Sequence, residues 1–306
     1  MWFGTWHLGG HGFGPSQAQD SLDLIDFALN SGIRYFDTAP IYGEGKSERY
    51  LGKQVSSLRN EVFLSSKVGL RQEGRHFFHD GSETGIRNAL FASLERLNTD
   101  YLDLLSLHWP DQDIAISDSI SSLQRLKNDG YIRQWGICNV SEAQLQDIPK
   151  GTPHQLRFNP LHHNWALLDA SQHCFNCAYS PFEQGLLATG RCHLGLNKLG
   201  KKDLRRRNNY FNSSILTTWK QRVHTDYLAH SKQLSPFTLE HLILLWILQF
   251  PKIQAVIFSA RTKNQLRSLL LLPNLFHQQG YSLSLKSDIR NFIQSLPFSL
   301  SASQPR

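Results

Sequence analysis

Four polar residues with complementary acid–base chemistry follow short apolar runs along the chain. Asp37 and Tyr42 lie in the segment FDTAPIYG, Lys67 lies in SSKVG, and His108 lies in LHWP. A tyrosine phenol is a poor acid at neutral pH because its free pKa is about 10. A nearby ammonium stabilises the phenolate and lowers that pKa, and a carboxylate keeps the ammonium charged and oriented. If the fold brings them together, these groups can protonate a carbonyl oxygen.

The elements that carry these residues alternate between strands and helices. The pattern predicts eight strands, at 2–5, 33–37, 61–65, 101–107, 132–138, 154–158, 174–179 and 254–258. It predicts helices between them at 47–54, 82–97, 117–126 and 237–248. Strands that alternate with helices indicate βαβ units and a parallel sheet.

Eight such units in 306 residues favour the α/β class and a closed (β/α)₈ TIM barrel. No Gly-x-Gly-x-x-Gly follows the first strand, which argues against an open Rossmann sheet. We therefore expect one domain over 1–306, with a long loop at 186–213 and a C-terminal tail at 272–306. Functional side chains of a barrel lie at the carboxyl ends of its strands, where the four residues fall.

Seven stretches of the chain resemble the aldo-keto reductase superfamily and follow one another in that family's order. They are FGTW at 3–6, YFDTAPIYGEGKSERYLG at 35–52, SSKVG at 65–69, RLNTDYLDLLSLHWPD at 96–111, GICN at 136–139, AYSPFEQGLL at 178–187 and SARTKNQ at 259–265. The resemblance implies a (β/α)₈ barrel that reduces aldehydes and ketones with NADPH or NADH and without a metal.

The resemblance also implies four catalytic roles. Tyr42 falls on the family's general acid, and Lys67 falls on the lysine that lowers its pKa. Asp37 falls on the carboxylate paired with that lysine. His108 falls on the histidine that orients the substrate carbonyl.

A second set of residues matches the family's pocket and cofactor contacts. Those implied at the substrate are Trp6 and Trp109. Those implied at the cofactor are Asn139 and Gln155 for the carboxamide, Tyr179 for the nicotinamide ring, Ser180 and Phe182 for the pyrophosphate, and Ser259, Arg261 and Gln265 for the adenosine phosphate. Because guanidinium groups suit phosphate geometry, Arg261 favours NADPH, with NADH as the alternative.

Two departures from the family pattern bear on these roles. Cys138 stands where the family often has a serine before the carboxamide-binding Asn139. Ser268 and Leu269 stand where relatives often have Glu-Asn at the adenine. The second departure keeps another class open, a nicotinamide-nucleotide-binding or sensing module with little turnover. The four intact catalytic positions favour the enzyme.

Composition excludes several other classes. The net charge is +7, but residues 198–207 carry six basic groups and one acid, and the rest of the chain has a net charge of only +2. This distribution argues against nucleic-acid binding and leaves the basic run as a solvated loop or a flap over the cofactor. No apolar run is long enough for a membrane span, and no signal peptide is recognised, so a cytoplasmic location is expected.

The cysteines and histidines do not form a convincing metal site. Cys174 and Cys177 are spaced like zinc ligands but fall within one predicted strand, where a spacing of three places them on opposite faces. Reduced core thiols and no metal are therefore expected. The substrate, the physiological direction and the oligomeric state stay open at this point.

Overall fold

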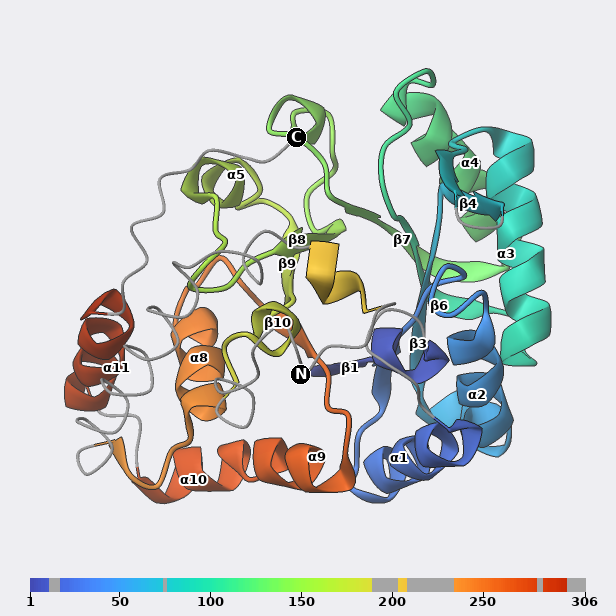
Figure 1. The fold of residues 1–306 in the computed structure, drawn as a ribbon. Helices are drawn as coiled ribbons and strands as arrows, with labels where there is room; N and C mark the ends of the chain where they lie inside the picture. The colour runs from blue at the N-terminus through green and yellow to red at the C-terminus, as the bar shows by residue number, and fades with distance from the viewer. Residues whose placement is uncertain (11–16, 74–75, 189–202, 208–233, 280–282, 296–306) are drawn as a thin grey trace.

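A computed structural model describes residues 1–10, 17–73, 76–188, 203–207, 234–279 and 283–295. Its centre is a closed barrel of eight parallel strands in the order β1-β10-β9-β8-β7-β6-β3-β2 (Figure 1). The strands are β1 (Trp2–Gly4), β2 (Tyr35–Asp37), β3 (Phe63–Val68), β6 (Leu102–Leu107), β7 (Ile132–Cys138), β8 (Pro153–Arg157), β9 (Phe175–Tyr179) and β10 (Ala255–Phe258). The predicted fold class is confirmed.

The strands have two buried faces, as parallel strands covered by helices must have. A small cluster fills the lower interior of the barrel, made of Trp2, Leu104, Cys177, Ala255 and Ile257. A much larger apolar cluster includes residues of both the strands and the surrounding helices. Nearer the mouth, polar residues replace apolar ones, and Lys67 of β3 pairs in register with Ser106 of β6.

Helices surround the barrel (Figure 1). They are α1 (Ala18–Asn30), α2 (Lys46–Val55), α3 (Glu83–Leu97), α4 (Ile116–Asn128), α5 (Trp165–Ala170), α8 (Leu239–Leu248), α9 (Lys263–Leu270), α10 (Leu272–Gln279) and α11 (Leu283–Ser295). Side-chain caps fix several starts, since Ser82 accepts a hydrogen bond from the Gly85 amide and Thr238 accepts one from the His241 amide. Predicted helices and observed helices agree to within about two residues at most ends.

Short elements complete the mouth of the barrel. A two-stranded antiparallel hairpin, β4 (Leu70–Glu73) and β5 (His76–His79), follows β3 directly. The 3₁₀ turns within the described residues are η1 (Trp6–Gly9), η2 (Ser56–Glu61), η3 (Ala143–Leu145), η4 (Glu183–Gly185) and η7 (Leu204–Arg207). The sequence analysis assigned none of these turns and did not assign the hairpin.

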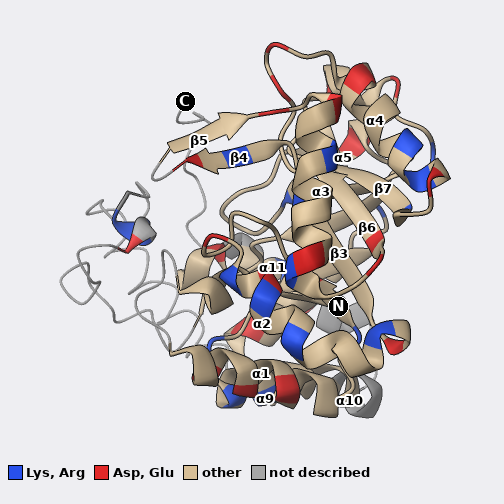
Figure 2. Cartoon of the chain, turned by 90° about the vertical axis from the view of Figure 1, so that its right-hand side faces the viewer, with Lys and Arg blue, Asp and Glu red and all other residues tan. Residues whose placement is uncertain are grey.

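Two predicted segments, the loop at 186–213 and the tail at 272–306, are described to different extents by the structure. Most of the predicted loop 186–213 lies outside the described residues. The tail at 272–306 contains α10 and α11, and Figure 1 shows α11 on the outer side of α8. On the face seen in Figure 2, basic and acidic residues are interspersed over the helices. Over the described residues, no helix is both long enough and apolar enough to cross a bilayer.

Candidate active site

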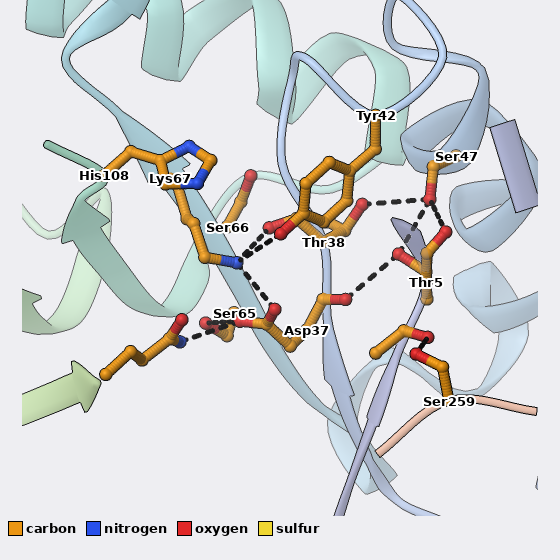
Figure 3. Close-up of polar contacts among 12 residues, drawn as sticks. Thr5, Asp37, Thr38, Tyr42, Ser47, Ser65, Ser66, Lys67, His108 and Ser259 are labelled. Carbon is orange, nitrogen blue, oxygen red and sulfur yellow. Dashed lines mark hydrogen bonds and ion pairs between the residues drawn. The ribbon is translucent and has the colours of Figure 1, made fainter. Parts of the chain in front are cut away.

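Lys67, at the end of β3, contacts two of the other three predicted catalytic residues, Asp37 and Tyr42 (Figure 3). Its ammonium nitrogen donates to Asp37 Oδ2 at 2.6 Å and lies 3.3 Å from the Tyr42 hydroxyl. A third bond, 2.9 Å long, goes to the backbone oxygen of Thr38. The structure therefore brings Asp37, Tyr42 and Lys67 into one connected group, although they come from β2, the loop after it and β3.

The Asp37–Lys67 ion pair is almost completely buried, with side-chain exposures of 4% and 3%. Burial of a charge is costly unless hydrogen bonds replace its hydration. Asp37 Oδ1 accepts such bonds from Ser65 Oγ at 3.1 Å and from Gln155 Nε2 at 2.8 Å. Gln155, expected at the cofactor carboxamide, thus donates a hydrogen bond from its amide nitrogen to the Asp37 carboxylate. Sequence spacing gave no sign of this contact, which spans 118 positions.

Burial and the neighbouring charges together set the protonation of this group. Burial raises the pKa of Tyr42 to about 12, and the Lys67 ammonium only partly opposes it. Lys67 lowers the pKa of Tyr42, as expected, but burial raises it by more, so the net shift of the pKa is upward. Burial would lower the pKa of Lys67, but Asp37 and Tyr42 outweigh it, so that pKa is raised. At neutral pH, Tyr42 is a protonated phenol and Lys67 is an ammonium.

His108, which follows β6, completes the group. Its ring meets the Tyr42 ring edge-on, at 6.2 Å between centroids, and Figure 3 shows both rings near the Lys67 side chain. Burial lowers the pKa of His108 well below its ordinary value, and the Lys67 ammonium adds to this shift. His108 is therefore a neutral imidazole at neutral pH, able to hydrogen-bond a carbonyl group.

The Tyr42 loop is held by contacts that the sequence analysis missed. Ser47 Oγ lies 2.7 Å from Thr5 Oγ1 and 3.2 Å from Thr38 Oγ1, which ties the first strand to the loop. Gly43 has a φ of +64°, and a Cβ added there would lie 2.4 Å from the Cα of Gly9. The two glycines of the GEGKS motif could have indicated this close approach of two backbone segments, because glycine is the residue that such an approach permits.

The two predicted tryptophans differ in position. Trp6 stacks beside Tyr42, with 6.0 Å between ring centroids and 27° between planes. Trp109 is 43% exposed and follows His108 directly. His79 of the hairpin contacts the backbone oxygen of Pro110 through its Nδ1 at 2.9 Å, so the hairpin base is fixed beside Trp109. Trp6 thus lies against the catalytic group, and Trp109 lies at the open edge of the mouth.

Asn139 and Tyr179 form a second connected set next to His108. The side-chain nitrogen of Asn139 donates to the backbone oxygen of His108 at 2.9 Å, and its Oδ1 accepts a hydrogen bond from the Tyr179 hydroxyl. Asn139 adopts a left-handed backbone, with a φ of +56°. Burial raises the pKa of Tyr179, so its hydroxyl stays protonated. Cys138, beside Asn139, is a buried thiol whose pKa burial raises to about 12.

Hydrogen bonds and an ion pair that the sequence analysis did not predict hold the loop after β9 in place. The buried Glu183 carboxylate pairs with Arg157 and accepts a hydrogen bond from Asn159 Nδ2 at 2.8 Å. The same Asn159 nitrogen donates to the backbone oxygen of Ser180 at 2.9 Å. Phe182 is 9% exposed and belongs to the apolar core. Ser180 and Phe182 therefore lie on a loop whose shape Glu183 fixes.

The three residues predicted at the adenosine phosphate lie between the end of β10 and the first turn of α9. Ser259 Oγ donates to the backbone oxygen of Gly4 at 2.7 Å. Gln265 Oε1 accepts from the Arg261 amide at 2.8 Å. Arg261 is half-buried; burial and the nearby Arg205 lower its pKa. Leu269 is 4% exposed and packs in the core, which explains in structural terms why no polar side chain occupies that position.

Part of the basic run lies within the described residues, at η7. Arg205 forms a bidentate pair with Asp203, with Nε–Oδ1 at 2.9 Å and Nη2–Oδ2 at 2.6 Å. Both side chains are at most 4% exposed. This piece of the basic run is therefore buried and does not have the exposure of a freely solvated loop. Arg205 also lies close enough to Arg261 to lower the pKa of Arg261.

The cysteine pair considered for zinc differs from its predicted placement. Cys174 precedes β9, and only Cys177 lies within that strand. Cys138, Cys174 and Cys177 are free buried thiols. A search of the described residues for three or more grouped histidine, cysteine or carboxylate ligands finds no such cluster.

The mouth of this parallel barrel holds a buried aspartate–lysine pair, a tyrosine hydroxyl and a neutral histidine. Such an arrangement is typical of barrel enzymes that transfer a proton. A profile of the Aldo/keto reductase family matches residues 1–274, and the chain belongs to this family of enzymes.

Individual relatives agree with this assignment. The chain is 30% identical over 276 residues to aldo-keto reductase YhdN of Bacillus subtilis, covering 87% of this chain and 82% of that one. It is 28% identical over 311 residues to an NADH-specific methylglyoxal reductase of Escherichia coli, covering 90% of each. A glycerol dehydrogenase structure from Gluconobacter oxydans superimposes with a TM-score of 0.80 at 24% identity, covering 99% of this chain and 94% of that one, and shows the shared fold.

Proposed function

We propose that this protein reduces an aldehyde or ketone with a nicotinamide cofactor, or oxidises the corresponding alcohol or aldose. The observation that carries the proposal is the chain of contacts from Asp37 through Lys67 to the Tyr42 hydroxyl. A proton donor beside a permanent cation suits a reaction that leaves negative charge on an oxygen atom.

Each residue of the group has a defined task. Tyr42 donates its hydroxyl proton to the carbonyl oxygen as that oxygen gains charge. Lys67 stabilises the phenolate that remains, and Asp37 keeps the lysine charged and oriented. The neutral His108 hydrogen-bonds the carbonyl oxygen and aligns it with the tyrosine. In alcohol oxidation the same groups act in reverse.

The residues around the mouth fit a nicotinamide cofactor. Asn139 supplies an amide and Tyr179 an aromatic ring, and the two are in contact beside His108. Gln155 contributes a second amide in the same interior, and Trp6 a wall beside Tyr42. The chemistry that a nicotinamide cofactor supplies when bound is hydride donation to the carbonyl carbon.

We infer that NADPH is preferred over NADH. The half-buried Arg261 supports this preference because a guanidinium group suits the geometry of a phosphate. The methylglyoxal reductase of Escherichia coli, a relative of this chain, is named as NADH-specific, so NADH is the alternative to be tested.

A nucleotide-binding module with little turnover is the second candidate. The burial of Leu269 favours it, because this side chain offers no polar contact to an adenine. The complete Asp37–Lys67–Tyr42 arrangement favours the enzyme, because a module that only binds has no need of a buried proton donor.

A cofactor-oxidation screen separates the two candidates. Purified protein is mixed with NADPH or NADH and with a panel of aldehydes, ketones and aldoses, and cofactor loss is followed by absorbance. We expect turnover with at least one carbonyl class and its loss in the Tyr42→Phe variant. Tight NADPH binding with no turnover on any carbonyl would establish the binding module instead.

A further inference from the structure

An aromatic hollow lies on the outer side of the barrel, between α5, α8 and α11, which Figure 1 shows together on one flank. Its volume is about 550 Å³, within the range of roughly 300–1,000 Å³ that small-molecule sites occupy. Among the described residues, those that line it include Pro160, His163, Trp165, Trp246, Phe250 and Arg290. None of them belongs to the catalytic group or to the residues proposed for the cofactor.

The walls of this hollow are held by ring-to-ring contacts. Trp246 is 5% exposed and stacks on Phe158, with 5.6 Å between centroids and 18° between planes. Phe250 meets Trp165 at 5.2 Å and Trp246 at 5.0 Å, both edge-on. Because each ring is held by another, the apolar surface is formed before any ligand arrives.

Trp165 is the unusual member of these walls. It begins α5, where Asn164 caps the helix, and it is 45% exposed beside the buried Trp246. His163 lies 4.9 Å from the Trp165 ring and is itself fixed through Nδ1, 3.2 Å from the backbone oxygen of Asn159. A large exposed aromatic surface within a concave site is a frequent mark of a binding site.

Arg290, an exposed residue of α11, gives the hollow a charge. Among the described residues, no acidic side chain pairs with its guanidinium. The lining that the structure describes contains no carboxylate either. Within the described part of the chain, the site therefore combines flat aromatic walls with one cation that no carboxylate neutralises.

We propose that this hollow binds a small planar aromatic molecule that carries a carboxylate. The ring would pack against Trp165 and Phe250, and the carboxylate would accept hydrogen bonds from the Arg290 guanidinium, a geometry that suits two parallel N–H···O bonds. The ligand site is separate from the proposed catalytic mouth, and its existence does not depend on the proposed reaction.

Calorimetric titration of the full-length protein with 2-naphthoate tests the proposal. The neutral 2-naphthamide serves as the matched probe, because it keeps the ring system and removes the charge. We expect 2-naphthoate to bind with one-to-one stoichiometry and 2-naphthamide to bind about five-fold more weakly or worse, the effect of one partly exposed ion pair.

Two variants locate the site. Arg290→Gln removes an exposed charge and should weaken 2-naphthoate about five-fold, with little effect on 2-naphthamide. Trp165→Ala should weaken both probes. Arg87→Gln, which removes an exposed guanidinium on α3, is the matched control and should bind both probes like the wild type. The proposal is overturned if the two probes bind alike, if neither binds at millimolar concentration, or if Arg290→Gln and Trp165→Ala both bind like the wild type.

Discussion

Removal of the Lys67 ammonium tests the proposed chemistry most directly, because the substitution leaves the proton donor in place. Lys67→Met keeps the length of the side chain and deletes the charge that lies 3.3 Å from the Tyr42 hydroxyl. The phenol then loses the charge and the hydrogen bond of Lys67, both of which lower its pKa, and becomes a weaker acid than its present pKa of about 12 implies. Carbonyl reduction should therefore slow.

The size of the effect follows from the distance. At 3.3 Å and an effective dielectric constant of about 20, a full charge on the tyrosine oxygen gains about 5 kcal/mol from the ammonium. If about half of that charge has developed in the transition state, the gain is about 2.5 kcal/mol, or about 70-fold in rate. Tyr42→Phe should cost more, roughly 10²–10⁴-fold, because it removes the donor itself.

The assay measures kcat for carbonyl reduction and, separately, cofactor affinity by fluorescence titration. Cofactor affinity should change little in either variant, since neither side chain is assigned to the cofactor. Lys67→Met strands the buried Asp37 carboxylate, so the double variant Asp37→Asn, Lys67→Met serves as a neutral control for misfolding. Near-normal turnover in Tyr42→Phe would refute the reasoning. The neutral His108 would then be the next donor to test.

Three further outcomes are expected. Gly43→Ala should destabilise the fold by more than Gly130→Ala, because both glycines have positive φ, which costs about 1–2 kcal/mol for alanine, but only Gly43 also meets another backbone; equal losses in thermal unfolding would contradict this. Burial lowers the pKa of His154 to about 4, so the unfolded chain binds more protons between pH 4 and 6.5 and stability falls as pH falls through that range. The loss should be about 2 kcal/mol between pH 6.5 and 5, and His154→Gln should show a flatter pH profile in thermal melts. Arg261→Ala should weaken NADPH more than NADH in fluorescence titration, and an equal loss would remove the proposed phosphate contact.

Local patterns were sufficient to predict the barrel and the meeting of Asp37, Tyr42 and Lys67 at its mouth. The apolar runs at β6 and β7 are long enough to predict strands from composition alone. Asp37 and Lys67 lie at the ends of β2 and β3, and His108 directly follows β6. The resemblance then supplied roles for residues whose types alone left them open. Helix α1 was missed, although buried Leu24, Ile25, Ala28 and Leu29 follow a helical stripe that was available in the sequence.

Long-range pairings could not be predicted in the same way. The contact between Gln155 and Asp37 depends on strands that meet only when the barrel closes. The net rise in the pKa of Tyr42 depends on burial, which residue spacing does not report. The burial of Arg205 with Asp203 could not be predicted because the composition of the surrounding sequence is typical of a solvated loop. In each case the missing quantity was the tertiary environment.

The buried Asp37–Lys67 pair has a consequence for directed evolution of this protein. Replacing a buried ion pair by well-packed apolar residues is often neutral or stabilising, by about 1–4 kcal/mol, whereas losing one partner is strongly destabilising. A library selected only for thermal tolerance should therefore lose both residues together or neither. Variants that lose both residues would be robust barrels in which the Tyr42 proton donor has no ammonium to stabilise its phenolate, so a screen for heat resistance must retain a turnover step in every round.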